Sequence, residues 1–401
     1  MASCVLLCEA LVLSVAIINS LSSGIVEGRS ITKEEYLQMK EHMKFLNKPA
    51  VKSIQTTYGD IFDCVDIYKQ PALDHPLLRN HTIQMRPNTY PKGIKINEAS
   101  SSKAPNLALK NGGCPLGTIP IRRTQMYDMV RSTSLSKFGK KFINDQSMHH
   151  YAKAEIKGQY YGARVTINLW NPRVQGTWKS WTEFSLVQMW VVAGAGNQLN
   201  TIEAGWMVYR RIFGDYHTRL FIYWTSSQTT IIKQVATICY AKDFVQVNKD
   251  IGLGGTLEPV SVYNGTQTSI TLYVFQDKKD ENWWLAVGSG IWVVAVGYWP
   301  KELFNFLNIK ADKVAWGGEV YGESPLPEMG SGHFPSEGYG KAAYIKEIQI
   351  IDQSKVVRDF DLLHDQCEYF VDKPGCYLGY PVTQDPMGTF ILFGGPGGNC
   401  S

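Results

Sequence analysis

The chain has 401 residues, of which 44% are hydrophobic and 19% charged, and its net charge is +4. This composition is typical of folded proteins and excludes long disordered tracts, and the length is enough for two or three domains. The small net charge gives no reason to expect nucleic acid or an anionic membrane as a partner.

Residues 1–23 resemble a secretory signal peptide. An apolar core at residues 10–18 is followed by small polar residues, as in the cleavage zone of such signals. We therefore expect residues 1–23 to be removed and the protein to be secreted, with a membrane anchor or a fortuitous apolar start as the alternatives. The longest later apolar run, Ile291–Trp299, has the length of a strand, so no membrane span is expected after the signal is removed.

The cysteines agree with an oxidising compartment. Cys4 and Cys8 would leave with the signal, and the six that remain can form three disulfides. These six are Cys64, Cys114, Cys239, Cys367, Cys376 and Cys400. Asn80 and Asn264 each begin an N-x-[ST] sequence and are predicted glycosylation sites.

The first element after the signal is a predicted helix at residues 30–48. Thr32 and Glu35 have the spacing of a capping box, and Pro49 ends the helix. Residues 49–112 are polar and rich in turns, and a Cys64–Cys114 bridge would make them a small unit of their own. Residues 132–149 are polar and basic and read as a linker, in which His149 and the adjacent His150 are expected to be solvated.

From residue 150 onward the hydrophobic period changes to two. Apolar and polar residues alternate at 165–169, 219–224 and 270–274, which is typical of an antiparallel β-sandwich or barrel. A short helix is predicted at Pro300–Leu307, with proline in its first turn. The expected order is a signal, a small N-terminal unit, a linker and a large all-β domain.

Several standard catalytic motifs are missing from the sequence. It contains no G-x-S-x-G, H-E-x-x-H or G-x-x-x-x-G-K-[ST], so serine-hydrolase, zinc-peptidase and P-loop functions lack their usual signatures. A dispersed Ser-His-Asp triad stays open. No cofactor or metal site is predicted. His333 lies in a glycine-rich turn, where a structural role is expected and a functional role is the alternative.

Two strand glutamates are the better candidates for chemistry. Alternation puts Glu203 on the strand face opposite Trp206 and beside Gly205. Glu319 likewise lies on the strand face opposite Trp316 and beside Gly317. A glycine on the same face removes bulk and lets another backbone approach, as a peptide or sugar lying across a sheet requires. The plainer alternative is a solvated sheet face.

Seven stretches of the sequence resemble the plant neprosin family, in the same order and from about residue 30 to the end. These stretches are residues 113–123, 161–172, 202–206, 218–224, 297–300, 316–320 and 329–334. The resemblance implies a small mixed activation-peptide domain at residues 24–146, ending in the linker, and an antiparallel β-sandwich peptidase domain at residues 147–401. It also implies a plant protein located in the apoplast or cell wall, with the vacuole as a further destination.

The activity implied by the resemblance is that of a glutamic endopeptidase, made as a zymogen, activated in acid and cutting after proline. Its catalytic residues would be Glu203 and Glu319, one ionised as base and one protonated as acid, because two close carboxylates do not both ionise readily. The activation peptide would act as an intramolecular inhibitor. The resemblance also implies two disulfides, Cys64–Cys114 and Cys376–Cys400.

The sequence departs from the family in its other cysteines. The family tends to have two cysteines before a Phe-Val-Gln segment, whereas this chain has only Cys239 there and an added Cys367. A Cys239–Cys367 bridge would balance the count, and a free thiol is the alternative. Two other functions also stay open, since a glycoside hydrolase uses paired carboxylates and a wall-associated binding protein could keep the sandwich without turnover.

Overall fold

A computed structural model describes residues 25–26, 29–92, 109, 112–132, 138–139, 146–174, 182–226, 243–289, 292–362, 364–382 and 390–400. They form two compact units. One comprises Met1–Lys48 and Thr124–Phe138, and the other comprises Pro49–Arg123 and Gly139–Ser401. The predicted signal peptide, residues 1–23, lies outside the described residues.

The smaller unit contains helices α2 (Lys33–Leu46) and α3 (Met126–Val130) and the short strands β1 (Ile25–Val26) and β2 (Arg29–Ser30). Helix α2 starts with the predicted capping box. The Thr32 side chain accepts from the backbone N–H of Glu35, and the Glu35 carboxylate accepts from the N–H of Thr32, both at 3.1 Å. These bonds satisfy N–H groups that the first turn of a helix leaves unpaired. The helix predicted from this pattern is confirmed.

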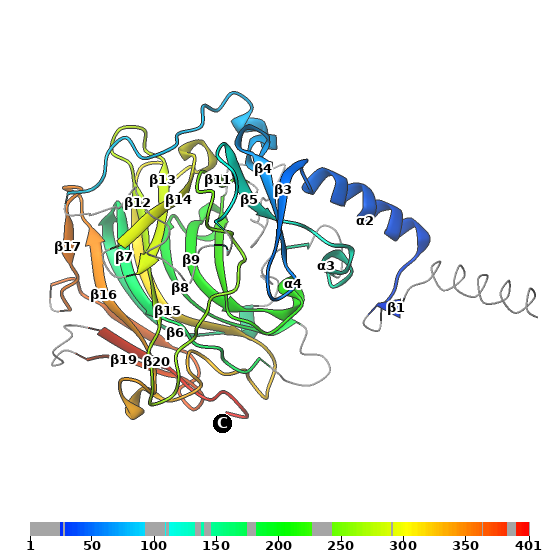
Figure 1. The fold of residues 1–401 in the computed structure, drawn as a ribbon. Helices are drawn as coiled ribbons and strands as arrows, with labels where there is room; N and C mark the ends of the chain where they lie inside the picture. Colours follow the sequence, from blue (N-terminus) through cyan, green and yellow to red (C-terminus); the bar gives the residue numbers. More distant parts are fainter. Residues whose placement is uncertain are drawn as a thin grey trace, which may run out of the picture. The chain divides into compact units, whose positions relative to one another are not determined.

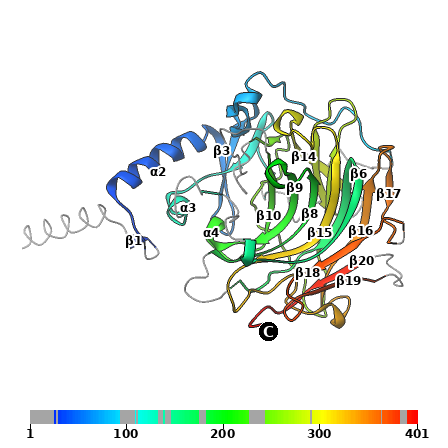
Figure 2. The same cartoon turned by 180° about the vertical axis from the view of Figure 1, so that it is seen from behind.

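The larger unit is built on two antiparallel sheets, and their strands are seen in Figures 1 and 2. In the six-stranded sheet the order is β10 (Arg219–Thr225), β9 (Asn200–Val208), β8 (Phe184–Ala193), β15 (Ala311–Tyr321), β6 (His149–Tyr160) and β18 (Glu368–Val371). In the nine-stranded sheet the order is β11 (Val245–Gln246), β14 (Trp292–Trp299), β13 (Trp283–Ser289), β12 (Ser269–Gln276), β7 (Gly162–Asn168), β16 (Ala343–Ile351), β20 (Phe390–Gly394) and β19 (Leu378–Val382), with β17 (Val357–Asp359) paired to β16. The prediction of a mostly antiparallel β fold is confirmed.

The core lies between these two sheets. Trp206 of β9 is fully buried, and its indole N–H donates to the backbone carbonyl of Asn168 on β7, at 2.9 Å. This contact between the sheets fixes which face of β9 is internal. Because successive strand residues point to opposite faces, the faces of β9 and β15 that carry glutamates are turned away from the nine-stranded sheet.

A third, three-stranded sheet belongs to the same unit. It contains β3 (Ala50–Gln55), β4 (Ile61–Asp66) and β5 (Thr118–Arg122), in that order. The predicted Cys64–Cys114 bridge is present, with Cα atoms 5.4 Å apart, and Cys64 packs in a small apolar cluster with Ile54 and Phe62. Residues 49–112 were expected to form a unit of their own. That expectation is wrong, because this sheet packs with the sandwich as one unit.

The helix predicted at Pro300–Leu307 is also wrong. Only Lys301–Leu303 form a turn, of the 3₁₀ type (η9), and Phe304 is extended. The side-chain oxygen of Asn200 accepts from the backbone N–H groups of Asn305, Phe306 and Leu307, at 3.1, 3.0 and 3.4 Å. These N–H groups therefore have a tertiary partner in place of a helical one.

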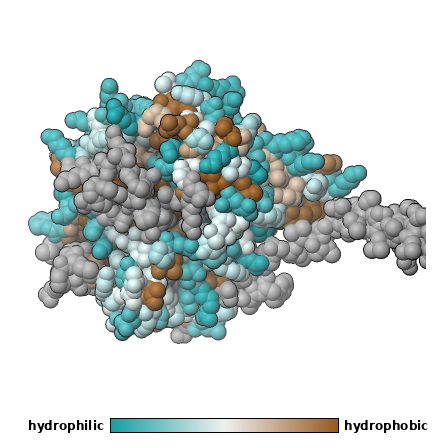
Figure 3. Space-filling view, in the orientation of Figure 1, coloured by the Kyte–Doolittle hydropathy of each residue, from teal (hydrophilic) through white to brown (hydrophobic). Residues whose placement is uncertain are grey.

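The other short elements connect the strands. They are α4 (Arg210–Phe213) and the 3₁₀ turns η1 (Ile67–Lys69), η2 (Pro71–Asp74), η3 (Pro76–Leu78), η6 (Gln146–Met148), η8 (Gly196–Gln198) and η10 (Pro335–Glu337). In the part of the chain that the structure describes, no helix is long and apolar enough to cross a membrane. On the face shown in Figure 3, apolar residues form separate patches among polar ones.

Candidate functional site

Glu203 lies in the middle of β9, on the face turned away from the core. Its side chain is almost fully buried, at 5% exposure, and Oε1 accepts a hydrogen bond from the hydroxyl of Thr201 at 3.2 Å. Tyr223 on β10 and Trp190 on β8 are its partners on the two neighbouring strands. Glu203 is thus flanked by two aromatic side chains on the same face.

Glu319 lies near the end of β15 and is 1% exposed. His149 of β6 contacts its carboxylate through Nδ1, at 2.7 Å from Oε1, and the Gln188 amide of β8 donates to Oε2 at 3.2 Å. His149 itself packs against the ring of Tyr321, with ring centroids 4.8 Å apart. Aromatic packing therefore holds the imidazole against the carboxylate.

The expectation that His149 and His150 lie in a solvated linker is wrong. Strand β6 begins at His149, so the last residue assigned to the linker is already in the sheet, and both histidines are buried. His150 Nδ1 lies 2.6 Å from a carboxylate oxygen of Asp372. Each histidine thus has an acidic partner that is distant in sequence, which local composition does not reveal.

Both glutamates lie on one face of the six-stranded sheet, with one strand between them. Glu203 is paired with Trp190 and Glu319 with Leu186, and both partners are on β8. The two glutamate strands are therefore about 10 Å apart sideways, and the positions differ by about 13 Å along the strands. The two glutamates expected to form a close pair are therefore not on adjacent strands, since β8 lies between them.

Gln188 occupies the position between the two glutamates. It is fully buried on β8 and is paired with Gly205 on one side and Gly317 on the other. All three residues share the face that carries Glu203 and Glu319, because directly paired residues point the same way. The amide side chain therefore stands between two positions that have no side chain.

The two glycines have a different role from the one expected. A Cβ at Gly205 would collide with the Val187 carbonyl oxygen, and one at Gly317 would collide with that of Ala152. Gly317 also has φ of +151°, which residues with side chains rarely adopt. The backbone that approaches each glycine is thus that of the neighbouring strand and not of a bound chain. The alternative of a solvated sheet face is also wrong, since both glutamates are buried.

The charges of both glutamates affect the pKa of two tyrosines on this face. Burial raises the pKa of Tyr151, and the charges of Glu319 and Glu203 raise it further. Burial likewise raises the pKa of Tyr223, with added contributions from Glu203 and then Glu319. Each tyrosine is therefore within electrostatic reach of both carboxylates, and both phenols stay protonated at any physiological pH.

Sequence reasoning missed Gln188, His149, Tyr151 and Tyr223. Gln188 did carry a signal, because it is the one amide in the apolar strand Phe184–Ala193. A polar residue in such a strand requires a specific buried partner. His149 carried a weaker signal, as the first residue of the alternating pattern in β6.

The remaining predicted sites are distributed over the larger unit. The Cys376–Cys400 bridge is present, with Cα atoms 5.5 Å apart. Cys367 forms no disulfide with another described residue, and Cys239 lies outside the described residues, so their pairing stays a prediction. Asn80 and Asn264 are exposed, as glycosylation requires, and the modification stays a prediction. Among the described residues no cluster of three or more His, Cys, Asp or Glu side chains could hold a metal ion.

His333 remains a loop residue. Its Nδ1 lies 2.9 Å from a carboxylate oxygen of Glu337, four residues on, and its ring packs on Tyr263 with centroids 4.3 Å apart. These contacts are local to the surface around the η10 turn. They fit the structural role that was expected.

The turn between β3 and β4 is joined to the six-stranded sheet by a buried charge cluster. Asp60 in this turn contacts Arg122 of β5 at 2.8 Å and Arg219 of β10 at 2.6 Å. All three side chains are at most 3% exposed. Further along the chain, the buried Asp277 accepts from the backbone N–H and the hydroxyl of Thr89, at 3.2 and 2.6 Å. The segment that precedes the sandwich is thus attached to it at two separate places.

Two family models match the chain. The model described as neprosin matches residues 181–396, and the model described as neprosin activation peptide matches residues 53–163. Glu203 and Glu319 fall in the first match, and Asp60 falls in the second. The fold and these matches define a peptidase made as a zymogen. The first match covers more than half of the chain, and the chain belongs to the neprosin family.

Proposed function

We propose that the protein is a secreted glutamic endopeptidase, with Glu203 and Glu319 as its catalytic residues. The observation that carries the proposal is the position of both buried carboxylates on one sheet face, with the Gln188 amide between them. A scissile peptide bond lying over β8 would have one carboxylate on each side. A water molecule on one side and the leaving amine on the other are what peptide hydrolysis requires.

We assign Glu319 as the general base. His149 and Gln188 present nitrogen atoms to its two oxygens, and N–H donors stabilise an ionised carboxylate. An ionised carboxylate only accepts hydrogen bonds, so His149 then carries a proton on Nδ1. Glu319 would take a proton from the attacking water, and Glu203, in its protonated form, would polarise the carbonyl and supply a proton to the leaving amine.

Gln188 would help to hold the substrate. Its Nε2 donates to Glu319, whereas its Oε1 is buried and has no hydrogen-bond partner among the described residues. Leaving a buried acceptor unpaired costs about 1–3 kcal/mol. A substrate backbone N–H or the attacking water would remove this cost, which favours binding at this position.

Proline preference and acid activation are the finer parts of the proposal. Trp190 and Tyr223 flank Glu203 and supply the flat apolar surface that a proline ring requires. Acid activation would begin with protonation of Asp280, which contacts the activation peptide. Burial and the nearby charge of Asp277 raise the pKa of Asp280, against the hydrogen bonds it receives from Asn282, Gln84 and Asn88. Asp280 therefore becomes protonated at a higher pH than an ordinary aspartate, and this would weaken the hydrogen bond that it accepts from Asn88 of the activation peptide.

Secretion and the predicted cleavage points complete the proposal. Disulfides are typical of oxidising compartments, and two are present. We propose that residues 1–23 are the signal peptide and that the activation peptide ends near residue 146, in the η6 turn directly before β6. Cleavage there would separate the activation peptide from the sheet that carries both glutamates.

The test is to express the precursor and incubate it from neutral to acidic pH, down to about 3, where carboxylates become protonated. Processing is followed by mass spectrometry, and proline-containing peptides are then offered as substrates. We expect processing near residue 146 and cleavage after proline. Glu203→Gln and Glu319→Gln should each lower kcat at least about 100-fold without changing the unfolding curve.

A folded precursor that neither matures nor cleaves any peptide at any pH would contradict the peptidase proposal and favour a non-catalytic binding protein. Full activity of either glutamine variant would contradict the site assignment. Release of sugar from wall polysaccharides, blocked by the same variants, would instead assign the pair to glycoside hydrolysis.

A further inference from the structure

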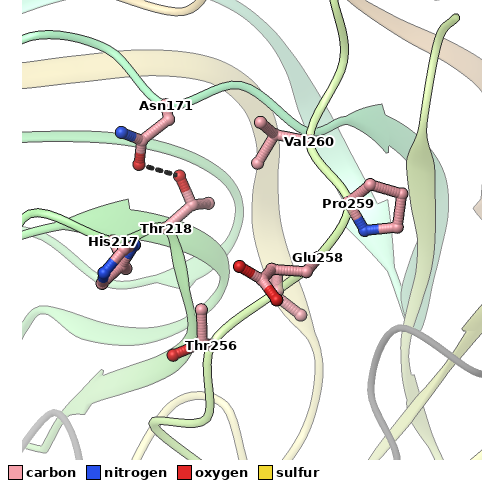
Figure 4. A pocket seen from close by; sticks show the side chains of 8 residues that line it. Asn171, His217, Thr218, Thr256, Glu258, Pro259 and Val260 are labelled. Carbon is pink, nitrogen blue, oxygen red and sulfur yellow. Dashed lines mark hydrogen bonds between the residues drawn. The ribbon is translucent and has the colours of Figure 1, made fainter. Parts of the chain in front are cut away.

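A pocket of about 670 Å³ opens beside the start of β10, away from the two glutamates. One side is formed by His217 and Thr218, the other by residues 256–260, and Asn171 lies at the end (Figure 4). The Thr218 hydroxyl donates to the side-chain oxygen of Asn171 at 2.9 Å, which holds that end of the pocket in place. Glu258 adds a carboxylate to the opposite wall.

The activation peptide places a tyrosine against this pocket. Tyr58, in the turn between β3 and β4, packs its ring over the imidazole of His217, with centroids 4.3 Å apart and an angle of 50° between the planes. Its hydroxyl donates to the carboxylate of Glu258. A single side chain therefore contacts two of the pocket residues, one through its ring and the other through its hydroxyl.

The turn that carries Tyr58 is held firmly. Asp60, two residues on, makes the buried contact with Arg219, and Arg219 is two residues after His217. Both partners of the turn thus come from one short stretch of the sandwich. Tyr58 itself is an exposed side chain, and the anchored turn places it beside His217 and Glu258.

We propose that this pocket is a substrate subsite that binds a tyrosine side chain of the peptide, and that Tyr58 occupies the same contacts in the precursor. The chemistry matches a phenol, since an imidazole packs against the ring in a tilted arrangement and a carboxylate accepts from the hydroxyl. The inference rests on the proposed peptidase function for the role of the bound peptide. Recognition of tyrosine itself requires no catalysis.

The distance from the glutamates suits a substrate that crosses the sheet. Arg219 of β10 is in register with Met207, Leu186 and Glu319 on the next three strands. Three strand spacings are about 14 Å, which an extended peptide spans in about four residues. The preferred tyrosine is therefore expected about four residues from the cleaved bond.

The first experiment measures binding without cleavage. Tyr58→Ala is made in the full-length precursor, and binding of N-acetyltyrosinamide and N-acetylphenylalaninamide is followed by saturation-transfer NMR. We expect the tyrosine amide to bind the variant about tenfold more tightly than the phenylalanine amide, because only it donates to Glu258. The wild-type precursor, in which Tyr58 occupies these contacts, should bind neither. Adding Glu258→Leu should abolish the tenfold preference.

Tyr68→Ala is the matched control, since Tyr68 is also in the activation peptide but is 73% exposed. This variant should not bind the tyrosine amide. Absence of saturable binding to a folded Tyr58→Ala precursor would overturn the proposal. So would equal binding of the two amides.

The second experiment uses the mature enzyme and peptides with one proline and a tyrosine moved along the sequence. We expect one position, about four residues from the cut, to lower KM about tenfold, and Glu258→Leu to remove this effect. Cleavage that is indifferent to tyrosine at every position would overturn the subsite. If the enzyme cleaves nothing, the peptidase proposal fails. The amide-binding experiment still tests whether the pocket binds tyrosine.

Discussion

Two buried acids in the larger unit differ in the partners that surround them. Asp60 lies between two arginines, which are charged at every relevant pH. Glu319 contacts an imidazole and an amide, of which the first can gain or lose a proton and the second is neutral. Burial alone therefore does not identify a catalytic acid. The permanently charged arginines at Asp60 suit a structural attachment, whereas the titratable imidazole and the neutral amide at Glu319 suit proton transfer.

The largest effect on stability is expected at the arginine-bound acid. Asp60→Asn removes the counter-ion that two buried guanidinium groups share, while Arg219 keeps its ion pair with Asp215, and the precursor should be destabilised by about 3 kcal/mol. Urea unfolding of the precursor measures this. Asp63→Asn is the matched control in the same sheet, because its partner Arg123 is 37% exposed and the loss should be about 1 kcal/mol. Equal losses of unfolding free energy in the two variants would show that the Asp60 cluster stabilises the precursor no more than the exposed pair does.

At the glutamate face the main effect should be on rate. Gln188→Met keeps the length of the side chain but removes the donor to Glu319, and kcat should fall about 10–100-fold. KM should also rise, because the Oε1 acceptor proposed to bind the substrate is lost. Gln276→Met is the control, since it removes another buried amide, which donates to the Asn308 carbonyl at 3.2 Å. It should lower stability and leave kcat unchanged. A similar loss of kcat in both would indicate a general packing effect.

A smaller, pH-dependent effect is expected where β6 begins. Burial raises the pKa of Asp372, but hydrogen bonds from His150 and the Tyr151 backbone outweigh it and hold the pKa below its usual value. The contribution to folding stability is therefore present above the unfolded pKa near 3.8 and lost as pH falls through the lower folded value. Asp372→Asn should destabilise the protein at pH 6 but not in strong acid. A loss that is the same at every pH would contradict this linkage.

The smallest effect is expected on the exposed surface of α2. Lys44 and Glu41 form an ion pair at 2.7 Å in which both side chains are more than 60% exposed. Lys44→Ala should change the free energy of unfolding by less than about 0.5 kcal/mol. This variant sets the baseline for the changes at Asp60, Gln188 and Asp372. A change above 1 kcal/mol would show that charge contacts in this protein cannot be ranked by burial.

The candidate site could be predicted only in part. Alternation along each strand placed Glu203 and Glu319 on the face opposite a tryptophan, and that relation is local. Their separation depends on the order of strands, in which β8 lies between β9 and β15. Gln188 and His149 contact Glu319 from strands 131 and 170 residues away in sequence. No local pattern contains such pairings.

The sequence by itself determined the elements whose cause is local. The capping box at Thr32 and Glu35 formed as predicted, although α2 begins at Lys33 and not at residue 30. The period-two stretches became strands, and the family motifs indicated the order of the two domains. Tertiary structure decided the rest, because side chains from distant strands supply the partners. It placed Gln188 between the glutamates, put His149 into the sheet, replaced a predicted helix near Phe304 with a loop held by Asn200, and attached the Asp60 turn to Arg219. Hydrogen bonds and charge pairs of this kind require a complete fold, since burial is what makes each unpaired group costly.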